Sequence, residues 1–101
     1  MIVIMRKPDN SPKTVRGKMF TFIVEYKLKH DGCAPSYMEI VDSLYIGSRS
    51  TVKYHLVMLE RIGMIKPLDG RSRTLEIVGG YVDAKENYPE YFEGTDNEKN
   101  T

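Results

Sequence analysis

Two short stretches of the sequence combine hydroxyl groups with cations. The first carries Ser48, Arg49, Ser50, Thr51, Lys53 and Tyr54, and the second carries Arg71 and Arg73 beyond an Asp69-Gly70 pair. Short hydroxyls can hydrogen-bond to the edges of nucleic-acid bases, and long cations pair with phosphates. Each stretch also has a plainer interpretation, as a helix cap or as a solvated loop. Nucleic-acid binding is favoured only if the fold places both stretches on one surface.

The remaining reactive side chains do not form a catalytic or metal-binding pattern. Cys33 is the single cysteine, and neither His30 nor His55 has a partner at metal-ligand spacing. We expect both histidines to be structural and Cys33 to be a small, half-buried apolar residue. The sequence contains no glycine-rich phosphate loop and no nucleophile elbow. It therefore predicts no metal, no cofactor and no enzymatic activity.

Length and charge narrow the class of protein further. A chain of 101 residues has room for one small domain. Residues 1–80 carry 13 Lys or Arg against 8 Asp or Glu, whereas residues 81–101 carry 2 against 6. A basic body with an acidic tail is typical of nucleic-acid binders, although many other proteins share it. The lone cysteine and the lack of any long apolar run predict a soluble, cytoplasmic protein that does not enter a membrane.

The first element expected is a helix from about residue 14 to residue 30. Residues 1–13 contain several turn formers, so we expect an N-terminal arm or edge strand there. Apolar side chains then recur at helical spacing, at Val15, Met19, Phe22, Ile23 and Tyr26. Asp31 and Gly32 are expected to end this helix, because glycine adopts the left-handed conformation without strain.

Two further helices follow, separated by a tight turn. Ser36 and Glu39 form a capping box, which predicts a helix to about Leu44. Its expected core residues are Met38, Ile40, Val41 and Leu44. Residues 45–47 form the turn, and residues 48–62 form the third helix, which Gly63 closes. The core face of the third helix is expected to hold Val52, Leu56 and Leu59.

The chain beyond Gly63 is expected to form a β-hairpin and then a tail. Residues 65–68 and 74–78 are the expected strands, joined by the turn at residues 69–70. Residues 79–101 are acidic and lack a sustained period, so we expect them to be largely disordered. The fold class is therefore mainly α (α+β): a three-helix winged helix-turn-helix over residues 14–78, with a C-terminal two-stranded β-hairpin wing.

This order of elements places the two hydroxyl and cation stretches where such a domain touches DNA. The second helix braces the third, whose first turns project into the major groove, and the hairpin tip meets phosphates or the minor groove. The first stretch opens the third helix and the second forms the hairpin tip. The two stretches together therefore predict a site for double-stranded DNA.

Four segments resemble the N-terminal DNA-binding domain of LexA repressors. They are residues 35–40 (PSYMEI), 48–56 (SRSTVKYHL), 59–65 (LERIGMI) and 73–77 (RTLEI). The resemblance covers roughly residues 14–78. It implies that bases are read from the first two turns of the third helix by Ser48, Ser50, Thr51, Lys53 and Tyr54. It also implies that Arg71 and Arg73 of the wing lie on the DNA backbone.

Two features depart from that family. Tyr45 stands where the family usually has glycine in the turn, so we expect a turn that is strained or differently built. LexA repressors also continue into a domain that dimerises and cleaves its own chain, and this sequence ends before such a domain. We therefore do not extend self-cleavage to it.

The sequence as a whole predicts sequence-specific binding to double-stranded DNA and repression of transcription by covering a promoter. We expect a monomer in dilute solution that pairs on a palindromic site. Two alternatives remain open. The domain could instead be a protein-protein interaction module whose hydroxyl and basic face docks an acidic protein surface. The acidic, aromatic tail could serve as that surface or fold back over the basic face. It could also be an accessory DNA-binding protein of a phage or plasmid.

Overall fold

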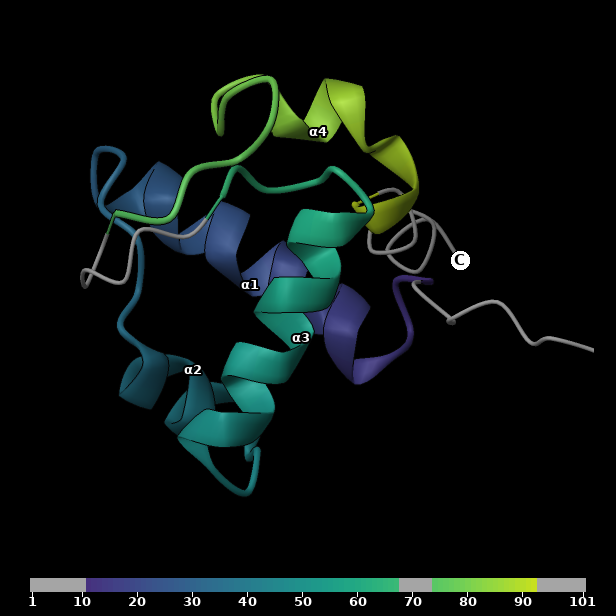
Figure 1. Cartoon of the computed structure of the whole chain (residues 1–101). Helices are drawn as coiled ribbons and strands as arrows, with labels where there is room; N and C mark the ends of the chain where they lie inside the picture. The colour runs from purple at the N-terminus through teal and green to yellow at the C-terminus, as the bar shows by residue number, and fades with distance from the viewer. Residues whose placement is uncertain (1–10, 68–73, 93–101) are drawn as a thin grey trace, which may run out of the picture.

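A computed structural model describes residues 11–67 and 74–92 of the protein (Figure 1). Its helices are α1 (Val15–Lys29), α2 (Tyr37–Leu44), α3 (Arg49–Arg61), α4 (Ala84–Asn87) and the 3₁₀ helix η1 (Pro89–Tyr91). The three helices expected from the sequence are confirmed, each within about one residue of its expected bounds. Most of the predicted arm (residues 1–10), the hairpin tip (68–73) and the end of the tail (93–101) lie outside the described residues.

The core face of α1 is wider than its sequence spacing suggested. Met19 and Ile23 are fully buried as expected, but so are Phe20 and Val24, whereas Val15 is 48% exposed. Val15 shares the helical spacing of the other apolar residues but lies outside the buried face. The buried face is wide because α1 has two sets of neighbours, α2 and α3 on one side and η1 on another. A helix that packs on two sides buries a broader arc than an ordinary amphipathic helix.

The start of α2 follows its sequence signal closely. The backbone N–H of Glu39 donates to Ser36 Oγ at 3.1 Å, and the backbone N–H of Ser36 donates to Glu39 Oε1 at 2.7 Å. This reciprocal pair confirms the capping box. Ile40 is buried, but Met38 is 46% exposed and was wrongly assigned to the core.

Helical spacing explains the exposure of Met38. The side chains of α2 that pack on the core are those of Tyr37, Ile40, Val41 and Leu44. Ile40 and Val41 follow Tyr37 by three and four residues and precede Leu44 by four and three, so the four side chains share one face. Residue 38 lies outside that face.

The α2–α3 turn sets how α3 sits on the core. Tyr45, the C-cap of α2, has φ 55° and ψ 42°, which is the left-handed conformation. The strained turn expected at the departure from glycine is therefore present. After it, Val52, Leu56 and Leu59 are all fully buried, as the spacing predicted. The helix ends before Gly63, whose φ of 85° also suits glycine.

Beyond α3 the chain returns to pair with itself at one point. Ile65 and Ile77 form an isolated antiparallel bridge. The backbone N–H of Lys66 donates to the Glu76 carbonyl at 2.9 Å, and that of Val78 donates to the Met64 carbonyl at 3.0 Å. No longer strand is present within residues 11–67 and 74–92. The hairpin predicted from the sequence is thus represented here only by its base.

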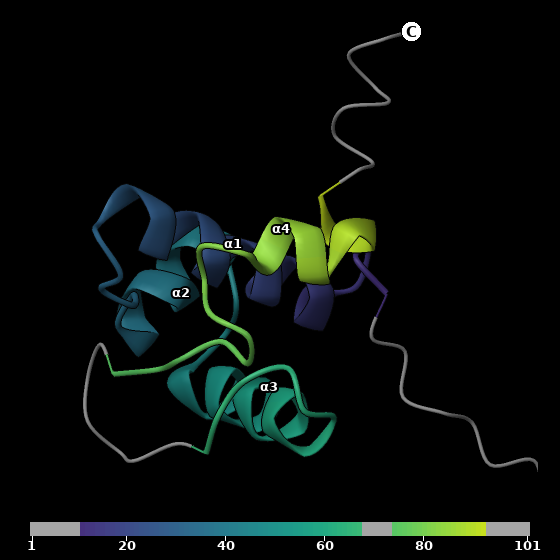
Figure 2. The same ribbon diagram turned by 90° about the horizontal axis from the view of Figure 1, so that it is seen from above.

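The prediction of disorder from residue 79 was wrong as far as Phe92. Residues 84–91 form α4 and η1, which lie over α1 on the side away from α2 (Figures 1 and 2). The Phe20 ring centroid lies 4.9 Å from that of Tyr88 and 5.2 Å from that of Tyr91. Ala84 and Tyr91 are buried. The acidic composition led to the prediction of disorder, but these aromatic side chains supply the apolar contact that an ordered segment needs.

Candidate nucleic-acid interface

The start of α3 leaves all six polar residues predicted for it accessible. Each of the following is exposed: Ser48, Arg49, Ser50, Thr51, Lys53 and Tyr54. The buried residues of α3, at positions 52, 56 and 59, fix the rotation of the helix. Helical spacing puts Ser50, Lys53 and Tyr54 on the side away from them, and Ser48, Arg49 and Thr51 are exposed around the start of the helix.

Ser48 caps α3 and is exposed at the same time. Its Oγ accepts a hydrogen bond from the backbone N–H of Thr51 at 3.3 Å and lies 3.2 Å from Thr51 Oγ1. The capping interpretation of Ser48 is thus confirmed. The start of a helix also carries partial positive charge from its remaining unpaired N–H groups. An anion such as a phosphate would be stabilised there, next to the Arg49 side chain.

A residue of α1 that the sequence did not single out supports this face. Arg16 is buried at 7% exposure, and its guanidinium carbon lies 5.6 Å from the centroid of the Tyr54 ring. Its Nε donates to His55 Nδ1 at 3.2 Å. Burial lowers the pKa of His55, and the neighbouring Arg16 charge lowers it further. Nothing in the local sequence separates Arg16 from the other cations of its helix, because its partners lie 39 residues away.

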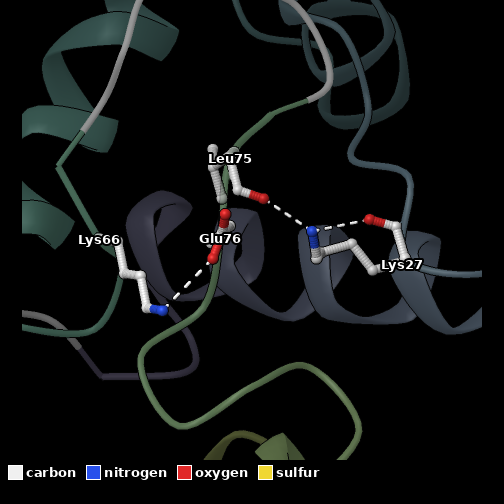
Figure 3. A network of polar contacts seen from close by, with 5 residues as sticks. Lys27, Lys66, Leu75 and Glu76 are labelled. Carbon is white, nitrogen blue, oxygen red and sulfur yellow. Dashed lines mark hydrogen bonds and ion pairs between the residues drawn. The ribbon is translucent and has the colours of Figure 1, made fainter.

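Arg71 and Arg73, which the sequence predicts to lie in a wing, are outside the described residues, but the segment that follows them is held by α1. Lys27, which is 4% exposed, donates through Nζ to the carbonyl of Leu75 at 2.7 Å and to that of Gly32 at 2.9 Å (Figure 3). Burial lowers the pKa of Lys27, against the opposing effect of the charge on Glu76. These contacts tie the segment that follows the predicted wing tip to α1.

The other reactive side chains considered in the sequence are those of His30, His55 and Cys33. His30 stacks on Tyr26 with ring centroids 3.9 Å apart, and His55 accepts the hydrogen bond from Arg16. Cys33 is exposed, so its predicted half-buried state was wrong; its neighbour Ala34 occupies the buried position instead. Within residues 11–67 and 74–92, no group of three or more His, Cys, Asp or Glu side chains could hold a metal ion. In the same residues, no helix has the length and apolar character needed to cross a bilayer.

Three helices around one core, with the third presenting its opening turns outward after a tight turn, define a helix-turn-helix DNA-binding domain. The family described as "LexA DNA binding domain" matches residues 11–74. The chain belongs to this family. The match extends from the turn before α1 to the residue before Leu75, and so includes the whole of α1, α2 and α3.

Two relatives show how far the similarity extends. The chain is 33% identical over 75 residues to the LexA repressor of Bifidobacterium longum (strain DJO10A), a match that covers 74% of this chain and 31% of the relative. It is 35% identical over 63 residues to the LexA repressor of Clostridium botulinum (strain Hall), covering 62% and 31%. The chain therefore spans less than a third of the length of these curated relatives. No solved structure matches it significantly.

Proposed function

We propose that this chain binds double-stranded DNA in a sequence-specific manner as a LexA-like transcriptional repressor, which acts by covering a promoter. The observation that carries the proposal is the exposed opening of α3, whose six polar side chains belong to a domain of a DNA-binding family. Such a helix start fits the major groove, where each base pair presents a distinct pattern of donors and acceptors. The protein would then reside with the chromosome in the cytoplasm.

Each side chain on this face has a role suited to its chemistry. Ser48, Ser50 and Thr51 are short and carry hydroxyls, so they can hydrogen-bond to base edges or to nearby phosphates. Arg49 and Lys53 are long cations, which pair with phosphates or with the acceptors of guanine. Tyr54, 56% exposed with Arg16 beside its ring, offers an aromatic edge and a hydroxyl at the second turn.

The predicted β-hairpin wing is the second part of this proposal. Arg71 and Arg73 would contact the DNA backbone beside the groove that α3 enters. The bridge between Ile65 and Ile77 supports the proposal, because it brings together the two segments that such a hairpin would join. The hydrogen bond from Lys27 to Leu75 fixes one of those segments.

Selection of bound duplexes from a random pool tests the proposal. An enriched sequence is expected, and two symmetric half-sites in it would support pairing of two copies on a palindrome. The logarithm of the binding constant should then fall with the logarithm of salt concentration, with a slope of about −0.9 for each phosphate contact. No enrichment, together with no binding near physiological salt, would overturn the proposal.

The Lys53→Ala variant tests what one of these side chains contacts. If Lys53 reads a base, the variant should lose discrimination at one position of the site; if it holds a phosphate, affinity for all sequences should fall alike. Lys85→Ala is the matched control. Lys85 is an exposed lysine of α4, which lies at the end of the molecule opposite the start of α3 (Figure 1). Equal losses in both variants would argue against a specific role for α3.

A further inference from the structure

Tyr45 combines a strained backbone with an almost fully exposed ring. Its φ of 55° lies in a region that side chains other than glycine, asparagine and aspartate rarely adopt. The residue as a whole is 93% exposed. Its backbone is nevertheless held in place, because its N–H donates to the Val41 carbonyl and its neighbours Leu44 and Ile46 pack against the core.

No contact within the described fold accounts for a tyrosine at this position. Glycine would adopt the same turn without strain. Within the part of the chain that the structure describes, the Tyr45 side chain makes no hydrogen bond, ion pair or ring contact. Residues held in strained conformations cluster at active sites, ligand-binding sites and switch regions. The aromatic ring and its hydroxyl are therefore available for a contact outside the domain.

The position of Tyr45 indicates what that contact is. Tyr45 precedes the α3 cap Ser48 by three residues, which keeps their Cα atoms within about 11 Å of each other. The turn lies at the same end of the molecule as the start of α3, and α4 lies at the other end (Figure 1). The major groove is about 12 Å wide and is bordered by phosphates. With the first turns of α3 in the groove, the preceding turn would lie at its edge.

We infer that Tyr45 is a DNA-backbone contact whose phenol hydroxyl donates a hydrogen bond to a phosphate at the edge of the major groove. This inference rests on the proposed function and adds a contact to it outside α3 and the wing. Tyrosine is one of the side chains that donate to phosphate oxygens in protein–DNA complexes. A phosphate contact positions the protein and carries no base information, so Tyr45 contributes affinity for every sequence bound.

The test compares Tyr45→Gly and Tyr45→Phe with the wild-type chain on the duplex that the wild type selects. Tyr45→Gly should bind about ten times more weakly or worse, as expected for the loss of one hydrogen bond to a charged acceptor. Its midpoint of urea unfolding should stay the same or rise, because the left-handed strain is removed. Tyr45→Phe keeps the strain and the ring, and it should lose affinity to a similar extent at unchanged stability. A neutral donor releases no counterion, so the salt slope should not change.

Tyr88→Phe is the control, since it deletes a hydroxyl that donates to the Val78 carbonyl at 3.0 Å. Tyr88 is the C-cap of α4, and α4 lies at the other end of the molecule from the α2–α3 turn (Figure 1). It should bind DNA like the wild type. Wild-type affinity in both Tyr45 variants would overturn the inference and leave the proposed function intact, and would point to a protein partner for the ring. Loss of stability and binding together in Tyr45→Gly would overturn it in favour of a structural role. If the wild type selects no duplex, both proposals fail.

Discussion

Arg16, at the start of α1, lies beside the ring of Tyr54 on the outward face of α3, with its guanidinium carbon 5.6 Å from the ring centroid. The same guanidinium donates to His55, the next residue along α3. One buried cation thus contacts two consecutive residues of the helix proposed to enter the groove. Because Arg16 is held by its own helix, it limits the positions that the Tyr54 ring can take.

Replacement of Arg16 should affect both stability and DNA binding. Arg16→Ala leaves His55 Nδ1 without its donor and removes the ring contact, so the free energy of unfolding should fall by about 1 to 3 kcal/mol. DNA affinity should fall as well, because the Tyr54 ring is no longer held. Urea unfolding and fluorescence anisotropy on a selected duplex measure the two effects. Lys18→Ala, an exposed position on the same helix, should change neither.

Protonation of His55 should destabilise the domain in mild acid. Burial, and then the Arg16 charge, lower the pKa of His55 below its ordinary 6.5, so the folded state binds this proton less readily than the unfolded chain. The contribution of neutral His55 to the free energy of unfolding is fully present above the pKa of this residue in the unfolded chain. It is lost as the pH falls through 6.5 toward the lower pKa of His55 in the folded state. A protonated Nδ1 can no longer accept the hydrogen bond from Arg16.

Comparison with His55→Asn isolates this effect. The asparagine side-chain oxygen can accept from Arg16 but does not titrate. Between pH 7.5 and about pH 5.5, the wild type should lose more of its unfolding free energy than the variant, with carboxylate titration common to both. Parallel pH profiles for the two proteins would show that His55 protonation has no part in stability.

The features that the sequence predicted well are local ones. The Ser36 and Glu39 capping box, the Ser48 cap and the buried face of α3 all depend on residues within two turns of each other, so spacing alone reveals them. The exposed side of α3 followed from its buried side. Even the strain at Tyr45 was visible, because a single residue differed from the glycine that the turn favours.

The features that the sequence did not reveal are contacts between distant segments. Arg16 meets His55 across 39 positions, and Lys27 meets Leu75 across 48. No periodicity links such pairs, and a lysine or arginine on a helix is expected to be solvated. The ordered segment up to Phe92 was missed for a related reason. Its charge suggested disorder, whereas its few aromatic side chains pack on α1.

Lys27→Met should loosen the base of the predicted wing. The ammonium group donates to two carbonyls in a nearly closed site, and methionine fills a similar volume without a donor. The free energy of unfolding should fall by about 1 to 3 kcal/mol, since the buried Leu75 carbonyl and the part-buried Gly32 carbonyl lose their donor while the cost of burying a charge is removed. Amide hydrogen exchange should speed up at Lys66 and Val78, whose N–H groups form the adjacent bonds.

Lys66→Ala provides the comparison for Lys27. It removes the ion pair with Glu76, whose 3.3 Å contact joins two largely exposed side chains (Figure 3). Such pairs contribute about 0 to 1 kcal/mol, so this variant should remain close to the wild type. If Lys27→Met lowered the free energy of unfolding no more than Lys66→Ala does, the buried lysine would not be what holds the segment that follows the predicted wing tip.

Tyr91→Ala tests whether the segment after residue 79 is part of the domain. Tyr91 is 8% exposed, and its hydroxyl contacts Met64 Sδ at 3.8 Å while its ring packs edge-on against Phe20. Removal of a buried aromatic side chain typically costs about 3 to 5 kcal/mol. We expect a loss in that range in urea unfolding, whereas Val82→Ala, at a position 69% exposed, should stay within about 0.5 kcal/mol of the wild type. A disordered tail would instead make the two variants indistinguishable. Because this segment packs on α1 at the end of the molecule away from the start of α3 (Figure 1), DNA affinity should fall in Tyr91→Ala only as far as the folded fraction falls.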